Sequence, residues 1–300
     1  MSARVALLVN PTSGRGRGGR LAPVAARRLL DRGVDVTVHV GASPADMERL
    51  AREAVADGVD AVVACGGDGT VNLVLQAVAG TQTPLGMVPV GTGDDNARTM
   101  GIPLEDPAAA ADVVADGFVR TVDAATVESA DGTRRWFVGV LSSGFDSNVN
   151  ERANRISWPK GQARYMVSIL GELRTFRPVD YRVVLDDEEF VGRGMLVSVG
   201  NGISYGGGMK VCPGAVVDDG LLDLTWLHEV GKGTFLKVFP SVFKGTHVDH
   251  PSVTTHRGRR VRIEADGQIA YADGERIGPL PIEVEVHPGA LRVLVPRPTS

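Results

Sequence analysis

The sequence predicts an α/β domain with a parallel sheet, followed by an antiparallel β-sandwich domain. The chain has 300 residues, which is enough for two hydrophobic cores. Short apolar runs alternate with helical periodicity in the first part of the chain, whereas two-residue alternation dominates after residues 118–123. We therefore place a three-layer α/β domain at residues 1–123 and a β-sandwich domain at residues 124–300.

In the first domain, apolar runs predict buried strands at residues 4–10, 34–40, 61–65 and 84–89. Helical spacing follows at residues 21–30 and again after residue 70, and Ser43-Pro44 begins a helix at residues 45–56. Strands that alternate with helices in this order indicate a parallel sheet with helices on both faces.

In the second domain, strands are expected at residues 181–185, 195–199, 222–227, 261–263 and 282–286. Helical patterns occur at residues 163–176 and 232–243. This arrangement favours an antiparallel sandwich. The final apolar run, residues 291–295, could pair with either domain.

The composition is that of a globular protein, with 43% hydrophobic and 23% charged residues. The net charge of −4 argues against general nucleic-acid binding. The two cysteines, Cys65 and Cys212, are too few for a disulfide framework or a zinc site. No apolar run reaches the roughly 18 to 20 residues of a membrane-spanning helix, so we expect a cytoplasmic protein.

Glycine-bearing polar loops follow three of the predicted strands. They begin at Asn10, at Gly66 and at Gly91. In a parallel sheet these loops converge on one edge, where a following helix offers N–H groups to phosphate. Asp68 beside a phosphate implies a cation such as Mg²⁺. The alternative is an ordinary turn in which Asp68 or Thr70 caps the helix.

The motifs Asn10-Pro11-x-Ser13-Gly14, Gly66-Gly67-Asp68-Gly69-Thr70-x-Asn72 and Pro89-x-Gly91-Thr92-x-x-Asp95 resemble the diacylglycerol kinase catalytic domain family. This family is shared by soluble bacterial lipid kinases and by sphingosine and ceramide kinases. The third motif departs from the family pattern, because Asp94 stands in place of Asn and Asn96 in place of Phe. The Gly-Gly-Asp-Gly segment also occurs in NAD kinases.

This resemblance implies an NAD-kinase-like fold and an ATP- and Mg²⁺-dependent kinase that phosphorylates a lipid hydroxyl, with diacylglycerol to phosphatidic acid as the leading reaction. An NAD kinase or another small-molecule kinase is the first alternative. A non-catalytic nucleotide-binding regulator is the second. The active site would lie in the cleft between the two domains.

The resemblance also implies roles for individual residues. Asp273, in an Asp-Gly-Glu segment that a hairpin turn explains equally well, would be the catalytic base, and Asp68 would join it in catalysis. Asp68, Asp95 and Asp123 would hold or orient the catalytic Mg²⁺. The nucleotide contacts would be Asn10, Gly66, Gly67, Asp68, Gly69, Thr70, Val71, Asn72, Gly91, Thr92 and Asp95.

A second, structural Mg²⁺ would be held by Asp219 and the main-chain carbonyls of Val216 and Leu221, although Asp-Asp-Gly is also a common turn.

A lipid substrate requires contact with a membrane, here by peripheral binding to its inner face. The candidate surface is the basic segment Arg152, Arg155, Trp158, Lys160 and Arg164, for which a solvated protein face is the alternative. A homodimer is also considered.

Overall fold

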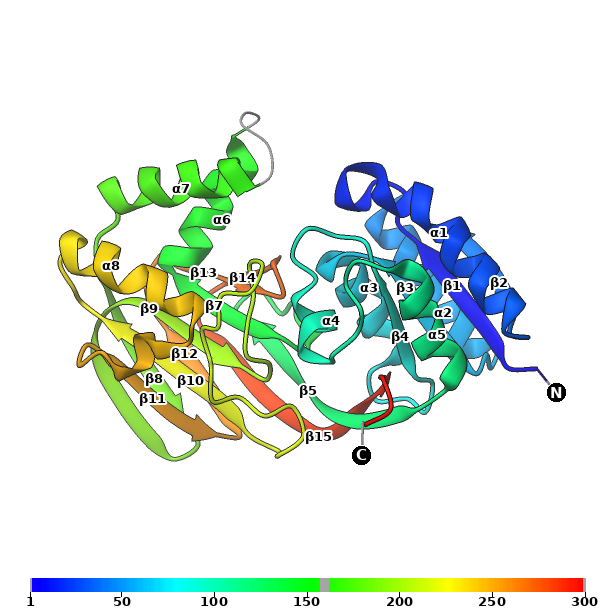
Figure 1. The fold of residues 1–300 in the computed structure, drawn as a ribbon. Helices are drawn as coiled ribbons and strands as arrows, with labels where there is room; N and C mark the ends of the chain where they lie inside the picture. The colour runs from blue at the N-terminus through cyan, green and yellow to red at the C-terminus, as the bar shows by residue number, and fades with distance from the viewer. Residues whose placement is uncertain (1, 157–161, 299–300) are drawn as a thin grey trace. The chain divides into compact units, whose positions relative to one another are not determined.

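A computed structural model describes residues 2–156 and 162–298 of the chain (Figure 1). It forms two compact units. The first comprises Met1–Ala124 and Pro288–Ser300, and the second comprises Ala125–His287. The predicted fold class, α/β followed by antiparallel β, is confirmed.

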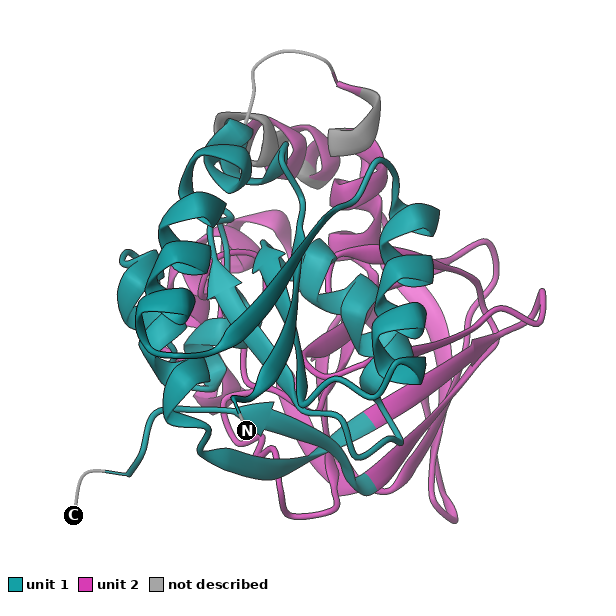
Figure 2. Cartoon of the chain, turned by 90° about the vertical axis from the view of Figure 1, so that its right-hand side faces the viewer, with its two compact units in different colours: residues 1–124, 288–300 teal, residues 125–287 magenta. Residues whose placement is uncertain are grey.

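The first unit is a three-layer α/β structure. Strands β2, β1, β3 and β4 lie in this order and are parallel. Helix α1 packs against α5 and α2 against α3, and Figure 2 shows helices on both sides of the strands. The elements are β1 (Arg4–Val9), α1 (Ser13–Asp31), β2 (Asp35–Val40), α2 (Pro44–Ala56), β3 (Ala61–Gly66), α3 (Asp68–Val78), β4 (Leu85–Pro89), α4 (Asp95–Thr99) and α5 (Pro107–Asp116).

Local chemistry accounts for these elements. Every residue of β3 is buried, as expected for a central strand of a parallel sheet. Helix α2 begins where the sequence indicates, because the Ser43 hydroxyl accepts a hydrogen bond from the Asp46 N–H at 3.1 Å and Pro44 occupies the first turn.

The second unit consists mainly of antiparallel strands. The order is β14-β13-β7-β9-β8-β12-β15, with β10 between β9 and β11 and with β5 beside β6. The strands are β5 (Val119–Ser129), β6 (Arg134–Phe137), β7 (Val140–Gly144), β8 (Val179–Leu185), β9 (Glu188–Gly200), β10 (Leu222–His228), β11 (Val253–Gly258), β12 (Arg260–Glu264), β13 (Ile269–Ala272), β14 (Glu275–Pro279) and β15 (Ile282–Leu294). The helices are α6 (Phe145–Arg155), α7 (Gln162–Thr175), α8 (Lys232–Val238), η1 (Phe239–Phe243) and η2 (Thr246–Asp249).

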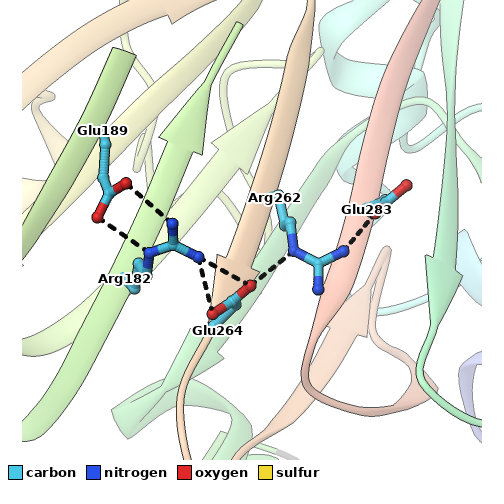
Figure 3. Close-up of polar contacts among 5 residues, drawn as sticks. All are labelled: Arg182, Glu189, Arg262, Glu264 and Glu283. Carbon is cyan, nitrogen blue, oxygen red and sulfur yellow. Dashed lines mark hydrogen bonds and ion pairs between the residues drawn. The ribbon is translucent and has the colours of Figure 1, made fainter. Parts of the chain in front are cut away.

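Side chains alternate between the core and the surface along β8 and β12, whereas β7 and β10 are buried along almost their whole length. Tyr181 and Trp226 are buried and meet edge to face, with ring centroids 6.0 Å apart. The surface of neighbouring strands carries a network of ion pairs (Figure 3), formed by Arg182, Glu189, Arg262, Glu264 and Glu283. The network joins β8, β9, β12 and β15.

The end of β15 belongs to the first unit. Val293 pairs with Leu85 of β4 in parallel orientation, and Leu291 and Val293 are fully buried. The run at residues 291–295 therefore extends the parallel sheet. Within the described residues, we find no helix with the length and apolar character that crossing a membrane requires.

Candidate active site

Three loops meet at the carboxyl edge of the first unit's sheet. The Asn10 amide donates to the Thr70 hydroxyl at 3.2 Å, which links the loop after β1 to helix α3. The Asn96 N–H donates to the Asp68 carboxylate at 3.0 Å, which links α3 to α4, the helix that follows β4. The convergence expected from the sequence is confirmed.

Glycine is required where these loops touch. A Cβ on Gly14 would lie 1.8 Å from the Val90 carbonyl oxygen, and Gly14 itself has a φ of +57°. A Cβ on Gly91 would lie 2.6 Å from the Cα of Gly67. The loops therefore pack backbone against backbone, which is the close approach that only glycine permits.

Carboxylates gather at this edge. Burial raises the pKa of Asp68, although the hydrogen bond from the Asn96 N–H opposes the shift. Burial, followed by the charge of Asp68, raises the pKa of Asp94 to about 7. Asp94 has a φ of +53°, a conformation that Asp and Asn tolerate, and its carboxylate accepts from the Gly91 N–H at 3.1 Å. A cation would relieve the repulsion between these groups.

The described residues contain no cluster of three or more His, Cys, Asp or Glu side chains arranged to hold a metal ion. A site that holds Mg²⁺ with one or two carboxylates and completes its coordination with phosphate oxygens and water would not form such a cluster. The half-buried Asp68 and the buried Asp95 are the carboxylates that such a partial site would use.

The predicted nucleotide-binding residues differ in whether their side chains are buried or exposed. Thr70, Val71 and Asn72 are buried in α3, whereas Thr92 is exposed in the loop after β4. The N–H groups of Thr70 and Val71 donate to the Gly67 carbonyl, at 2.9 and 3.1 Å. These two N–H groups are thus used within the protein, and a phosphate would meet the N–H groups that precede them.

Asp123 lies in another part of the first unit. Its side chain is 3% exposed and accepts a hydrogen bond from the Gly289 N–H at 2.8 Å, so it ties β5 to the C-terminal segment. A metal-orienting role for Asp123 stays a prediction.

Asp273 occupies a two-residue hairpin turn in the second unit. Asp273 and Gly274 have φ values of +50° and +82°, as a type I′ turn requires, and Ala272 pairs with Glu275 across it. The carboxylate is buried and accepts hydrogen bonds from the N–H groups of Val138, at 3.1 Å, and Gly139, at 2.9 Å. The segment is both a hairpin turn and a site that holds a carboxylate in one orientation.

The Asp219 carboxylate has a positively charged partner within the protein. One oxygen of Asp219 accepts from the Leu221 N–H at 3.1 Å, and the other contacts the Arg257 guanidinium. Arg257 also donates to Asp223 at 3.1 Å. In this arrangement a guanidinium faces the carboxylate that the structural Mg²⁺ would use, so this metal site is not supported by the geometry and stays a prediction.

An apolar cavity in the second unit has no counterpart in the sequence analysis. It has an empty volume of about 530 Å³, part of which is open to solvent. Aliphatic and aromatic side chains from β9, β10, α8, η1, β11 and the segment between β9 and β10 form most of its wall, together with Asp146, Thr225 and His247. Its apolar lining with a few polar groups is typical of a small-molecule binding site.

Comparisons with known proteins agree with both units. Residues 4–127 match the diacylglycerol kinase catalytic domain, and residues 139–295 match the YegS C-terminal NAD kinase beta sandwich-like domain. These two matches define a kinase with an α/β catalytic domain and a β-sandwich domain.

Relatives match along nearly the full chain. A protein named diacylglycerol kinase from Mycobacterium tuberculosis is 46% identical over 98% of this chain and 96% of its own length. One of the same name from Bacillus subtilis is 29% identical over 93% of this chain and 92% of its own length. The crystal structure of a diacylglycerol kinase from Bacillus anthracis has the same fold, with a TM-score of 0.72 at 21% identity over 98% of this chain and 97% of that one. The chain belongs to the diacylglycerol kinase family.

Proposed function

We propose that this protein transfers the γ-phosphoryl group of ATP to the hydroxyl group of a diacylglycerol and so forms phosphatidic acid. Its relatives that carry the name diacylglycerol kinase support this acceptor. The structural observation that carries the proposal is an apolar cavity in the unit that also holds the buried Asp273 carboxylate. A kinase for NAD, which is polar and charged, has no need of such a cavity.

ATP binds to the convergent loops of the first unit. The N–H groups at the start of α3, from Gly67 to Gly69, meet the phosphates at the positive end of the helix dipole. Asn10 and Thr92 complete the nucleotide site from the neighbouring loops. Asp68 and Asp95 would hold Mg²⁺, which when bound would neutralise charge on the phosphates.

Asp273 accepts the proton of the lipid hydroxyl as that oxygen attacks the γ-phosphorus atom. The N–H groups of Val138 and Gly139 hold both carboxylate oxygens in place, which fixes the orientation of the base. A base that is already oriented reduces the entropy cost of reaching the transition state.

The cavity accepts an acyl chain of the lipid. Met209 and Val211 line the cavity and pack against Val140, and the carbonyl oxygen of Val140 accepts a hydrogen bond from the Asp273 N–H. One wall of the cavity is therefore adjacent to the strand that positions the base. An acyl chain in the cavity and a hydroxyl group at Asp273 can therefore belong to the same lipid molecule.

A lipid substrate also requires peripheral membrane contact. In the basic segment proposed from the sequence, Arg152 forms an ion pair with Glu172 at 2.9 Å. Trp158 and Lys160 lie outside the described residues, as do the side chains of Arg155 and Arg164. The segment stays our candidate membrane surface.

The direct test is to incubate the purified protein with labelled ATP and, separately, with diacylglycerol, monoacylglycerol, sphingosine, ceramide and NAD. We expect label in phosphatidic acid and none in NAD phosphate. Label in NAD alone would establish the small-molecule alternative. If nucleotide binds but no acceptor is labelled, the protein is a nucleotide-binding regulator.

A further inference from the structure

Two polar side chains in the apolar cavity are buried without complete hydrogen bonding. Thr225, another polar residue of the wall, donates to the Cys212 sulfur at 3.6 Å. Asp146 and His247 each retain an atom with no partner among the described residues. Buried polar atoms in native proteins are nearly always paired, so an exception that faces a cavity points to a ligand.

Asp146 lies in the first turn of α6, directly after β7. Its side chain is 6% exposed, and its Oδ2 atom has no hydrogen-bond partner in the described part of the chain. Burial raises the pKa of Asp146 to about 7, which favours the neutral carboxylic acid. In that form the group can donate one hydrogen bond and accept others.

His247 has a defined tautomer. Its Nε2 atom lies 3.2 Å from the Val211 carbonyl oxygen, and because a carbonyl only accepts, Nε2 must carry the hydrogen. Burial lowers the pKa of His247, which favours the neutral ring. The Nδ1 atom is then an acceptor, and it has no partner within residues 2–156 and 162–298.

Asp146 lies at the far end of β7 from the base. Asp273 is bound to Gly139 and Val140, where β7 begins, whereas Asp146 follows Gly144, where it ends. Four steps along a strand, at roughly 3.3 Å each, separate the two ends by roughly 13 Å. A molecule whose hydroxyl is at Asp273 would therefore meet Asp146 with a distant part of its chain.

We propose that the cavity binds an acyl chain that carries a hydroxyl group, and that Asp146 and His247 recognise this group. A hydroxyl both accepts and donates, so it can accept from the Asp146 carboxylic acid and donate to Nδ1 of His247. A plain methylene chain would leave both groups unsatisfied, and a charged substituent would be buried unpaired. The inference rests on the proposed function, because it concerns the acyl chain of the same substrate.

The test compares distearoylglycerol with its counterpart that bears a hydroxyl group midway along one chain. The parent protein should show a kcat/KM roughly 3- to 10-fold higher for the hydroxylated lipid, the scale of one or two net hydrogen bonds. Asp146→Leu combined with His247→Phe should abolish or reverse this preference, and Asp146→Asn should keep part of it. Asp187→Leu, at an exposed turn, should keep the parent ratio.

Direct binding separates this inference from the proposed function. Displacement of a fluorescent fatty acid should be stronger with hydroxystearate than with stearate in the parent. This difference should be smaller in Asp146→Asn combined with His247→Phe, which replaces the first double variant if that variant fails to fold. Equal kcat/KM and equal displacement by both chains in the parent would overturn the inference. If neither diacylglycerol is phosphorylated, the proposed function fails and the displacement ratio alone decides the recognition of the hydroxyl.

Discussion

At the scale of single residues, Asp273 has a structural role in a hairpin turn, and we propose that it is also the base. Its positive φ belongs to the hairpin turn, and its carboxylate is bound by two backbone N–H groups far away in the sequence. Although it lies in a turn, Asp273 is only 8% exposed. A carboxylate in such a site is costly to replace, whether or not it accepts a proton.

We expect Asp273→Asn to lower kcat by roughly 100-fold or more, because proton transfer contributes on that scale. The amide cannot accept from both N–H groups, so the free energy of unfolding should also fall, by about 1–3 kcal/mol. ATP affinity should change little. Steady-state kinetics, nucleotide titration and thermal melting together separate the two effects. A folded variant with near-normal turnover would show that Asp273 is not the base.

At the scale of elements, the loop after β1 depends on close contact with the loop after β4. Gly14 and Gly16 both have positive φ, but only Gly14 faces a neighbouring backbone, whereas a Cβ on Gly16 would meet no atom within 4 Å. Substitution of Gly16 therefore tests the effect of backbone conformation alone. Substitution of Gly14 tests the same effect together with the contact between loops.

Gly16→Ala should lower the free energy of unfolding by about 1–2 kcal/mol, the cost of a left-handed conformation in alanine. Gly14→Ala should cost more than this and should also weaken ATP binding, because the new methyl group displaces the Val90 carbonyl. Denaturant unfolding and nucleotide titration provide the measurements. Equal effects of the two substitutions on ATP affinity would contradict the role of this loop contact.

The loop around Asp219 allows a test of which cation binds this carboxylate, Mg²⁺ or the Arg257 guanidinium. If Mg²⁺ binds there, Arg257→Gln should increase the rise in melting temperature that Mg²⁺ produces, because the competing cation is gone. Asp219→Ala should lower the melting temperature and reduce that rise. A Mg²⁺ response that is the same in the parent and both variants would assign the loop to Arg257 alone and exclude the predicted ligand set of Asp219, Val216 and Leu221.

The ion-pair network on the second unit should make stability depend on acid pH. Arg262, followed by Arg182, lowers the pKa of Glu264, and Arg182 lowers that of Glu189. A carboxylate whose pKa is lower in the folded than in the unfolded state stabilises the fold above its unfolded pKa, about 4.3, and this contribution is lost as the pH falls through the folded pKa.

The comparison is between the parent and Arg182→Gln, unfolded by urea from pH 7 to pH 3. The difference in stability between them should be small, because the network is exposed, and should shrink below about pH 4 and with added salt. A difference that grows as the pH falls would contradict the direction of these pKa shifts.

At the scale of the whole molecule, the question is how a chain in which no described helix can span a membrane reaches a lipid. Cations near an anionic surface each contribute on the order of 1 kcal/mol, and salt screens them. Binding through the segment that contains Arg152 should therefore be reversible and stronger on anionic vesicles.

Co-sedimentation with anionic vesicles at low and high salt tests this surface. The variant with Arg152, Arg155, Lys160 and Arg164 changed to Glu should sediment much less than the parent at low salt. Lys237→Glu combined with Lys244→Glu, on exposed positions of α8 and the loop after η1, is the matched control and should sediment like the parent. The opposite result would assign membrane contact to the surface around α8.

The sequence by itself determined the order of elements, the α/β and antiparallel classes, and the convergence of three loops on one sheet edge. These features follow from hydrophobic periodicity, turn residues and the geometry of parallel strands. The periodicity and the turn residues can be recognised within short stretches of the sequence. The three motifs were sufficient to indicate the family, because each lies at the end of a strand and carries its chemistry in consecutive residues.

Only the tertiary structure decided which distant groups meet. Val138 and Gly139 bind Asp273, Arg257 faces Asp219, and Asp146 and His247 share a cavity with residues from five other elements. Such pairs are separated by tens to more than a hundred residues, and antiparallel pairing and packing choose among many partners of similar character. A short stretch of sequence does not predict which distant residues will pair, because the pairing depends on burial and strand register over the whole unit.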